Sequence, residues 1–262
     1  MIIHRPGIHI VARQRQVAAA SAVASASESG ILSYRAKRSF DSGKFAKGYG
    51  QLERALLASR KEADLRSEAR VLIAMAQIRT MSLDLDFADS LLSIVRENVL
   101  DNSTRIQLAK TKVALLSARN KFSDAVRICD SYNEKSLKSA DENVQAAFYG
   151  GCAIAYTANR DQSRASESFK MLGKRTDKDG GFYAFTAARM ADISGSSDAD
   201  SLYRVAEEKA IKANKPYNTA NILYLRSQLK SVSKKEATDL KLRCKNAFEL
   251  MGLPNNAKRC GE

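Results

Sequence analysis

The sequence predicts an all-α protein built from stacked helical hairpins. A short pattern of an aromatic residue followed by small residues recurs at intervals of 34 to 42 residues, and a period in this range is typical of helical-repeat arrays. The 262 residues include only three prolines and no tryptophan. Val, Ile and Thr seldom alternate with polar residues as they would in strands. We therefore expect one solenoid of about six antiparallel hairpins.

The first 28 residues are treated as a separate segment. Residues 1–27 contain no acid, and Arg5, Arg13 and Arg15 precede the small, apolar stretch 17–26. A basic start, a short apolar core and an Ala-x-Ala ending are typical of a secretory signal peptide. An Arg-rich and acid-poor composition also fits an organelle transit peptide, and a tail without a targeting role is the third alternative. Secretion or a periplasmic, cell-envelope location is favoured, with cytoplasm and organelles left open.

Helical periodicity continues almost without interruption from residue 30. The expected helices are 30–41, 45–58, 62–81, 86–98, 103–118, 122–132, 141–158, 162–173, 180–193, 197–213, 217–230 and 234–250. Short polar separators supply Asp, Asn and Ser for helix N-caps and Gly for left-handed turns. They lie at 41–43, 84–86, 101–103, 119–121, 159–161, 194–196 and 215–216, and the longest loop is 174–181.

No change in composition marks a domain boundary within these helices. We expect one repeat domain over 29–251 and a polar tail over 252–262. Each helical pair leaves an apolar face that only the next pair covers, so the array should fold as a unit.

Four cysteines form two local pairs in the sequence. Cys244 and Cys260 are 16 residues apart, and a bond between them would hold the tail on the last helix. The chain-entropy estimate for such a loop is about 3 kcal/mol. Cys129 and Cys152 are 23 residues apart at apolar positions of consecutive helices, where buried free thiols are the alternative to a disulfide.

The clearest copy of the repeated pattern resembles the second half of a tetratricopeptide repeat (TPR). Small, aromatic and aliphatic residues stand in the order of that family at Gly43, Phe45, Gly48, Leu52, Ala55 and Leu56. Further copies share parts of this register, with Asn120, Phe122 and Ala125 in one and Tyr149, Ala153, Tyr156, Ala165 and Phe169 in another. The resemblance covers about residues 30–250 and implies a right-handed solenoid.

The same resemblance implies a concave groove lined by the first helix of each pair. In this register the groove residues would be Arg79, Gln107, Lys110, Ser117 and Arg226. Basic residues in such a groove would bind a carboxylate or an acidic peptide. The alternative for each long side chain is an ordinary solvated surface position.

No catalytic or metal-binding motif appears in the sequence. Gly-rich phosphate loops and the common zinc and nucleophile motifs are absent, and the two histidines, His4 and His9, lie in the first segment. The cysteines are too far apart for a zinc site. We therefore expect a non-enzymatic protein without cofactor or metal.

The net charge of +14 is compatible with acidic proteins, nucleic acids or anionic lipids. Half of this excess lies in residues 1–60, and acids and bases are mixed along the remaining helices. No apolar run is long enough to span a bilayer. The sequence thus favours a protein-interaction module or scaffold that binds a partner peptide or subunit. RNA binding by a helical repeat is the alternative, disfavoured by irregular repeat spacing, and the oligomeric state stays open.

Overall fold

The computed structural model describes residues 27–178 and 180–262, and every element in these ranges is helical. This confirms the prediction of an all-α protein. Its fourteen α-helices and one 3-10 helix are α2 (Glu28–Asp41), α3 (Phe45–Lys61), α4 (Leu65–Met81), α5 (Leu85–Ser93), η1 (Glu97–Val99), α6 (Asn102–Ala118), α7 (Phe122–Asp130), α8 (Glu134–Leu137), α9 (Glu142–Ala158), α10 (Gln162–Gly173), α11 (Gly181–Ile193), α12 (Ala199–Lys212), α13 (Pro216–Ser227), α14 (Lys234–Leu250) and α15 (Pro254–Gly261).

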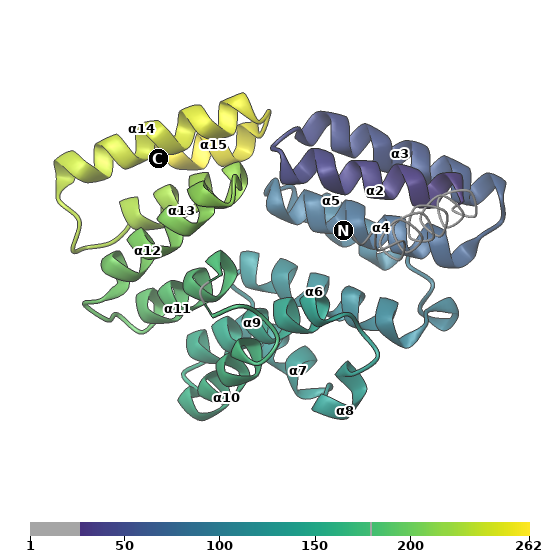
Figure 1. Cartoon of the computed structure of the whole chain (residues 1–262), viewed down its shortest axis with the longest axis horizontal. Coiled ribbons are helices and arrows are strands. Elements are labelled where there is room, and N and C mark those ends of the chain that lie inside the picture. The colour runs from purple at the N-terminus through teal and green to yellow at the C-terminus, as the bar shows by residue number, and fades with distance from the viewer. Residues whose placement is uncertain (1–26, 179) are drawn as a thin grey trace, which may run out of the picture.

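Consecutive helices pack in neighbouring pairs, as a helical-repeat fold requires. The principal pairs are α2 with α3, α4 with α5, α6 with α7, α9 with α10, α11 with α12, and α13 with α14 (Figure 1). Helix α4 also contacts α6, α6 contacts α9, and α9 contacts α11. We call the earlier helix of each pair a first helix. The handedness of the array and the number of repeats in the family sense stay predictions.

Eight tight turns between helices share one hydrogen-bond pattern. In each, two successive amides after the helix end bond back to carbonyls of its last turn, as Gly43 N does to Phe40 O and Lys44 N to Ser39 O. This is the Schellman motif, which needs one residue in the left-handed region. The residues with positive φ at these turns are Gly43, Ala63, Leu83, Asn120, Arg160, Gly195, Asn214 and Gly252.

The structure differs from the predicted elements at three places, the first of which is the short helix α8, where no helix was expected. The helix expected at 86–98 ends at Ser93. The prediction was too long because the apolar residues continue beyond the helix into a loop, where Val95 and Leu100 are buried. The segment expected to be a polar tail forms α15. Pro254 starts this helix, and its Ala257 and Cys260 are buried against the core.

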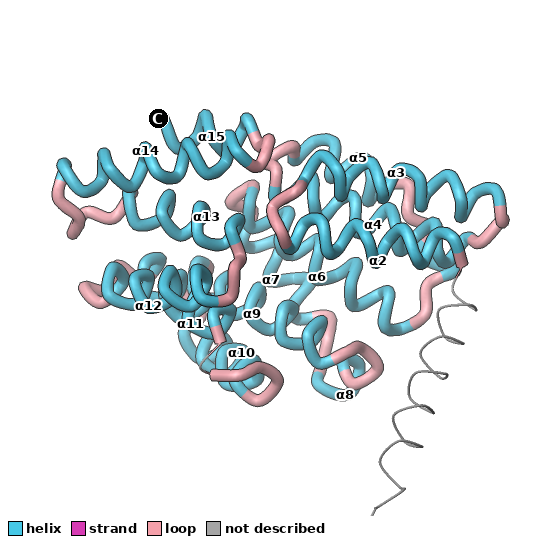
Figure 2. Tube along the Cα trace, turned by 45° about the horizontal axis from the view of Figure 1, so that its top comes forward, coloured by secondary structure: helices cyan, strands magenta, loops and turns pink. Residues whose placement is uncertain are grey.

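The chain closes on itself, because α13 and α15 contact the first helical pairs. The carbonyl of Met81 accepts hydrogen bonds from Tyr217 Oη at 2.9 Å and from Asn256 Nδ2 at 3.0 Å. Lys215 pairs with Asp41 at 2.8 Å. The two ends of the array meet in both views of the trace (Figures 1 and 2). An open solenoid has contacts between neighbours alone, so this curved array is a ring.

The apolar core follows the same closure. One buried cluster joins residues of α2–α6 to residues of α13–α15, for example Leu52 and Leu72 to Leu240 and Phe248. A second cluster lies in α6–α10 and a third in α11–α13. Each first helix thus shares apolar contacts with elements on both sides.

Two disulfide bonds fasten neighbouring helices. Cys129–Cys152 connects α7 to α9 with a Cα–Cα distance of 5.8 Å, and Cys244–Cys260 connects α14 to α15 at 5.9 Å. Both distances lie in the usual range for disulfides. The second bond holds α15, which carries part of the ring closure.

Candidate functional site

The five residues predicted to line a groove occupy different environments, and Arg226 is inside the protein. Its side chain is 4% exposed and bonds to three carboxylates, Asp200 at 2.9 Å, Glu207 at 2.7 Å and Glu236 at 3.0 Å. These acids lie on α12 and α14, on either side of α13. Arg226 therefore connects three helices, and its charge is balanced within the fold.

Arg79 and Ser117 are also engaged within the fold. The Arg79 guanidinium lies 4.0 Å from the centroid of the Tyr49 ring and 4.7 Å from that of Phe87. It also bonds to Asp84 at 3.2 Å. The Ser117 hydroxyl is buried and has no hydrogen-bond partner in the described part of the chain. Neither residue presents a free charged group to a partner.

Lys110 differs from Arg79, because it is partly buried without a described carboxylate to balance its charge. Its ammonium group, on α6, donates to Gln77 Oε1 of α4 at 3.0 Å. No described carboxylate pairs with it, and burial lowers its pKa. Gln107 is half-buried one turn earlier on the same helix. Lys110 thus lies where two first helices meet, α4 and α6.

Arg259 on α15 is in a similar situation and was missed by the sequence analysis. Its guanidinium lies 4.0 Å from the centroid of the Tyr224 ring, and Nη2 donates to Asn221 Oδ1 at 3.2 Å. The Nε atom is buried without a partner. Burial, together with repulsion from Arg189, lowers the pKa of Arg259. Both contacts of the Arg259 guanidinium are with α13.

These two residues stand apart from the other basic residues of the described chain. Within residues 27–178 and 180–262, they are the two cations whose pKa burial lowers. Buried or half-buried arginines elsewhere have carboxylate partners, as Arg119 has Asp86 and Asp89. The repeat register in the sequence predicted a groove position for Lys110. Nothing in the sequence predicted a role for Arg259, because the tail was not expected to form a helix.

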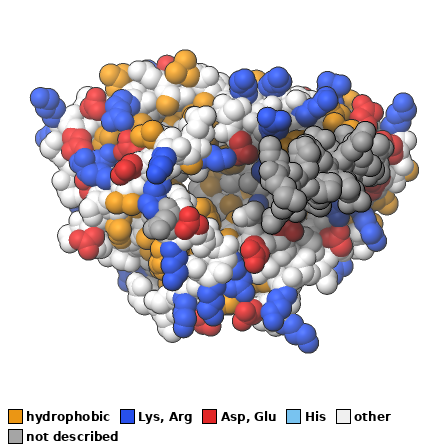
Figure 3. All heavy atoms as spheres, viewed as in Figure 1, with side chains coloured by type: hydrophobic (Ala, Val, Ile, Leu, Met, Phe, Trp, Pro, Cys, Tyr) orange, Lys and Arg blue, Asp and Glu red, His pale blue; other side chains and the backbone are white. Residues whose placement is uncertain are grey.

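Lys110 lies on one of the helices that surround the middle of the ring, and Arg259 of α15 packs against another, α13. Helices α4, α6, α9, α11 and α13 border this region in Figure 1. The face seen in Figure 3 is hollowed in the middle, with Lys and Arg side chains along its border. We name Lys110, Gln77, Gln107, Arg259, Asn221 and Tyr224 the inner basic site.

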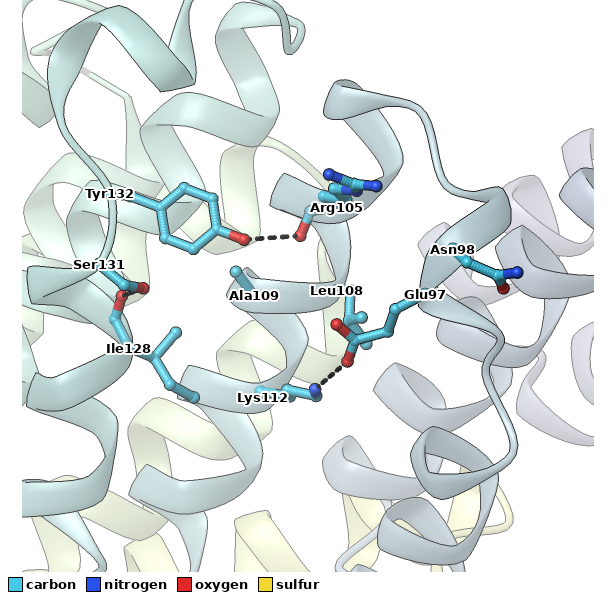
Figure 4. A pocket seen from close by; sticks show the side chains of 9 residues that line it. All are labelled: Glu97, Asn98, Arg105, Leu108, Ala109, Lys112, Ile128, Ser131 and Tyr132. Atoms are coloured by element: carbon cyan, nitrogen blue, oxygen red, sulfur yellow. Dashed lines mark hydrogen bonds and ion pairs between the residues drawn. The ribbon is translucent and has the colours of Figure 1, made fainter.

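A second concave surface lies on the opposite side of α6. This hollow of about 490 Å³ has Leu108, Ala109 and Ile128 as its apolar part. Figure 4 shows the Lys112–Glu97 ion pair across it, 2.7 Å long, and the Tyr132 hydroxyl directed at the Arg105 carbonyl. It continues into a hollow of about 300 Å³ above Leu92, Val95, Leu115 and Leu116. Its Lys112 is paired with Glu97, unlike the two cations of the inner basic site.

The comparisons with known proteins give no family. The sequence matches no protein-family model, and no curated protein sequence matches it either. In the described helices, none has both the length and the apolar character needed to cross a bilayer.

Proposed function

We propose that the protein is a non-enzymatic interaction module of TPR type that binds an acidic segment of a partner protein along its first helices. The observation that carries this proposal is the pair of partly buried cations at Lys110, between α4 and α6, and Arg259, against α13, neither of which has a carboxylate partner among the described residues. The right-handed solenoid and the concave groove belong to the same proposal, and the repeated pattern around Gly43–Leu56 supports them.

The energetic argument rests on desolvation. A cation held away from water without a counter-charge costs free energy, whereas a hydrogen bond to a charged partner contributes about 1.5–3 kcal/mol. A carboxylate from a partner would therefore gain more at Lys110 or Arg259 than at a solvated lysine. Packing against Tyr224 restricts the Arg259 side chain before binding, which reduces the entropy lost on complex formation.

Selection of 12-residue peptides from a random library by the full chain tests the proposal. We expect the selected peptides to be enriched in Asp and Glu. Their affinity, measured by fluorescence anisotropy, should fall about tenfold or more in Lys110→Met and in Arg259→Met, since 1.4 kcal/mol corresponds to a factor of ten.

Lys112→Met is the matched control, because Lys112 lies on the other side of the same helix and is paired with Glu97. Peptides without acidic enrichment, or equal affinity in the wild-type chain and both variants, would contradict the proposal. A loss of affinity in Lys112→Met alone would show that the peptide binds in the hollow of Figure 4 instead. Single-stranded RNA that binds at low salt and depends on Lys110 would favour the nucleic-acid alternative instead.

A further inference from the structure

A separate basic hollow lies between the end of α10 and the start of α11. Its volume is about 420 Å³, and its lining contains three lysines and no Asp or Glu. The lining residues are Ser166, Phe169, Lys170, Gly173, Lys174, Lys178, Tyr183 and Met190. On the face seen in Figure 3, Lys and Arg side chains gather over the part of the molecule where α10 lies.

The three lysines have no partner in the described chain, although acids are close along the sequence. Three acids near this region bind arginines instead, since Arg164 binds Asp130 and Asp161 and Arg175 binds Glu134. Lys170, Lys174 and Lys178 form no ion pair or hydrogen bond with any described residue. Three positive charges thus line one hollow without a carboxylate partner among the described residues.

Aromatic packing and a glycine shape the floor of this hollow. Phe169 of α10 and Tyr183 of α11 are stacked, with ring centroids 4.5 Å apart and planes inclined by 27°. A methyl group on Gly173 would lie 3.1 Å from Tyr183 Cε2 and 3.3 Å from Lys178 Cε. The absence of a side chain at this position lets the Lys178 stem and the Tyr183 ring approach α10. The lysine from the loop therefore converges with the two from the helix.

We propose that this three-lysine hollow binds a phosphate group carried by a compact ligand. A phosphate monoester has a charge of about −1.5 to −2 at neutral pH and three acceptor oxygens, which three separate ammonium groups match. Lysine is a point charge that suits phosphate, whereas planar carboxylates are matched best by the arginine fork. The hollow contains no arginine. This site is distinct from the inner basic site and does not depend on the proposed function.

Calorimetric titration of the full chain with inorganic pyrophosphate, at low and fixed ionic strength, tests the proposal. We expect saturable binding that weakens at least tenfold in Lys170→Met/Lys174→Met. Gly173→Ala should also weaken it, because the added methyl displaces Lys178. The control is Lys135→Met/Lys138→Met, which removes the same two charges at exposed positions near α8 and should leave the affinity unchanged.

Equal loss in both double variants would show that net charge alone attracts the ligand and would overturn the site, as would the absence of saturable binding. A parallel titration with a phosphoserine peptide and its unphosphorylated form identifies the source of the phosphate. Binding of pyrophosphate alone supports a small phosphorylated molecule. Binding of the phosphopeptide but not its unphosphorylated form supports a phosphorylated side chain of a protein.

Discussion

Individual charged residues divide into two groups with different consequences. Arg226, Arg204 and Arg243 interleave with Asp200, Glu207 and Glu236 at the meeting of α12, α13 and α14. Burial tends to raise the pKa of Asp200, but hydrogen bonds from Arg204 and Arg226 outweigh it and lower the pKa. The carboxyl therefore stays ionised at neutral pH, and this network contributes to the fold. Lys110 and Arg259 have no such counter-charges.

Removing Arg226 should strongly destabilise the protein. In Arg226→Met the buried Glu207 loses its closest cation, and breaking a buried ion pair from one side costs about 3–5 kcal/mol. Chemical denaturation monitored by circular dichroism measures this loss in the free energy of unfolding. Arg204→Met is the comparison, because that side chain is half exposed and its loss should cost about 1 kcal/mol or less. Equal losses in the two variants would refute the structural role of Arg226.

At the scale of elements, the turns between helices show which helix ends could be predicted from the sequence. Separators with Gly or Asn at the left-handed position, such as Gly43, Asn120 and Gly195, were predicted at the places where the structure has them. At Ala63 and Leu83 the same turn uses residues that lose about 1–2 kcal/mol there. Packing of the flanking helices imposes these turns. Local sequence propensity therefore did not predict the turn at Ala63, and it placed the turn at Leu83 about two residues too late.

Helix α15 and its site residue Arg259 also depend on long-range packing that the local sequence does not predict. Its sequence is polar, and it becomes a helix because Leu253, Ala257 and Cys260 reach a core formed by distant elements. Arg259 is placed by this packing alone. The position of Lys110 could be predicted, because it depends on the register within α6. Its isolation from carboxylates could not, because that depends on neighbours from α4.

Removal of the Cys244–Cys260 bond should release α15. In Cys244→Ala/Cys260→Ala we expect a loss of about 3 kcal/mol, from the loop of 16 residues that the bond closes in the unfolded chain. Hydrogen exchange should accelerate in α15 and at the Met81 turn, which α15 contacts through Asn256. The same change at Cys129 and Cys152 should accelerate exchange in α7 and α9 instead. Unaltered exchange of α15 after loss of its disulfide would contradict this prediction.

At the scale of the whole molecule, the closure determines the shape. The Tyr217 side chain is partly buried at this contact, where it packs against Phe45 and Phe248 and its hydroxyl donates to the Met81 carbonyl. Burial raises its pKa to about 12. The contact thus combines aromatic packing with hydrogen bonds to a helix end, whose carbonyls lack partners within the helix.

Breaking this contact should open the ring. In Tyr217→Ala/Asn256→Ala the Met81 carbonyl loses both donors, and the aromatic packing is lost as well. Small-angle X-ray scattering should then give a larger radius of gyration while the helical circular dichroism signal is retained. Lys215→Met is the milder control, because it removes only the partly exposed pair with Asp41. An unchanged radius with intact helices would show that the remaining contacts suffice for closure.

The meeting of the two ends also restricts how this chain can vary in length. An open stack gains or loses a helical pair at little cost, because each pair depends on its neighbours alone. Here the Met81 turn must meet Tyr217 and Asn256, which lie 136 and 175 positions later in the sequence. Deleting or duplicating one pair between them would rotate and displace the ends so that they no longer coincide. The number of pairs is therefore a geometric condition of the fold, as the number of segments is for a closed polygon.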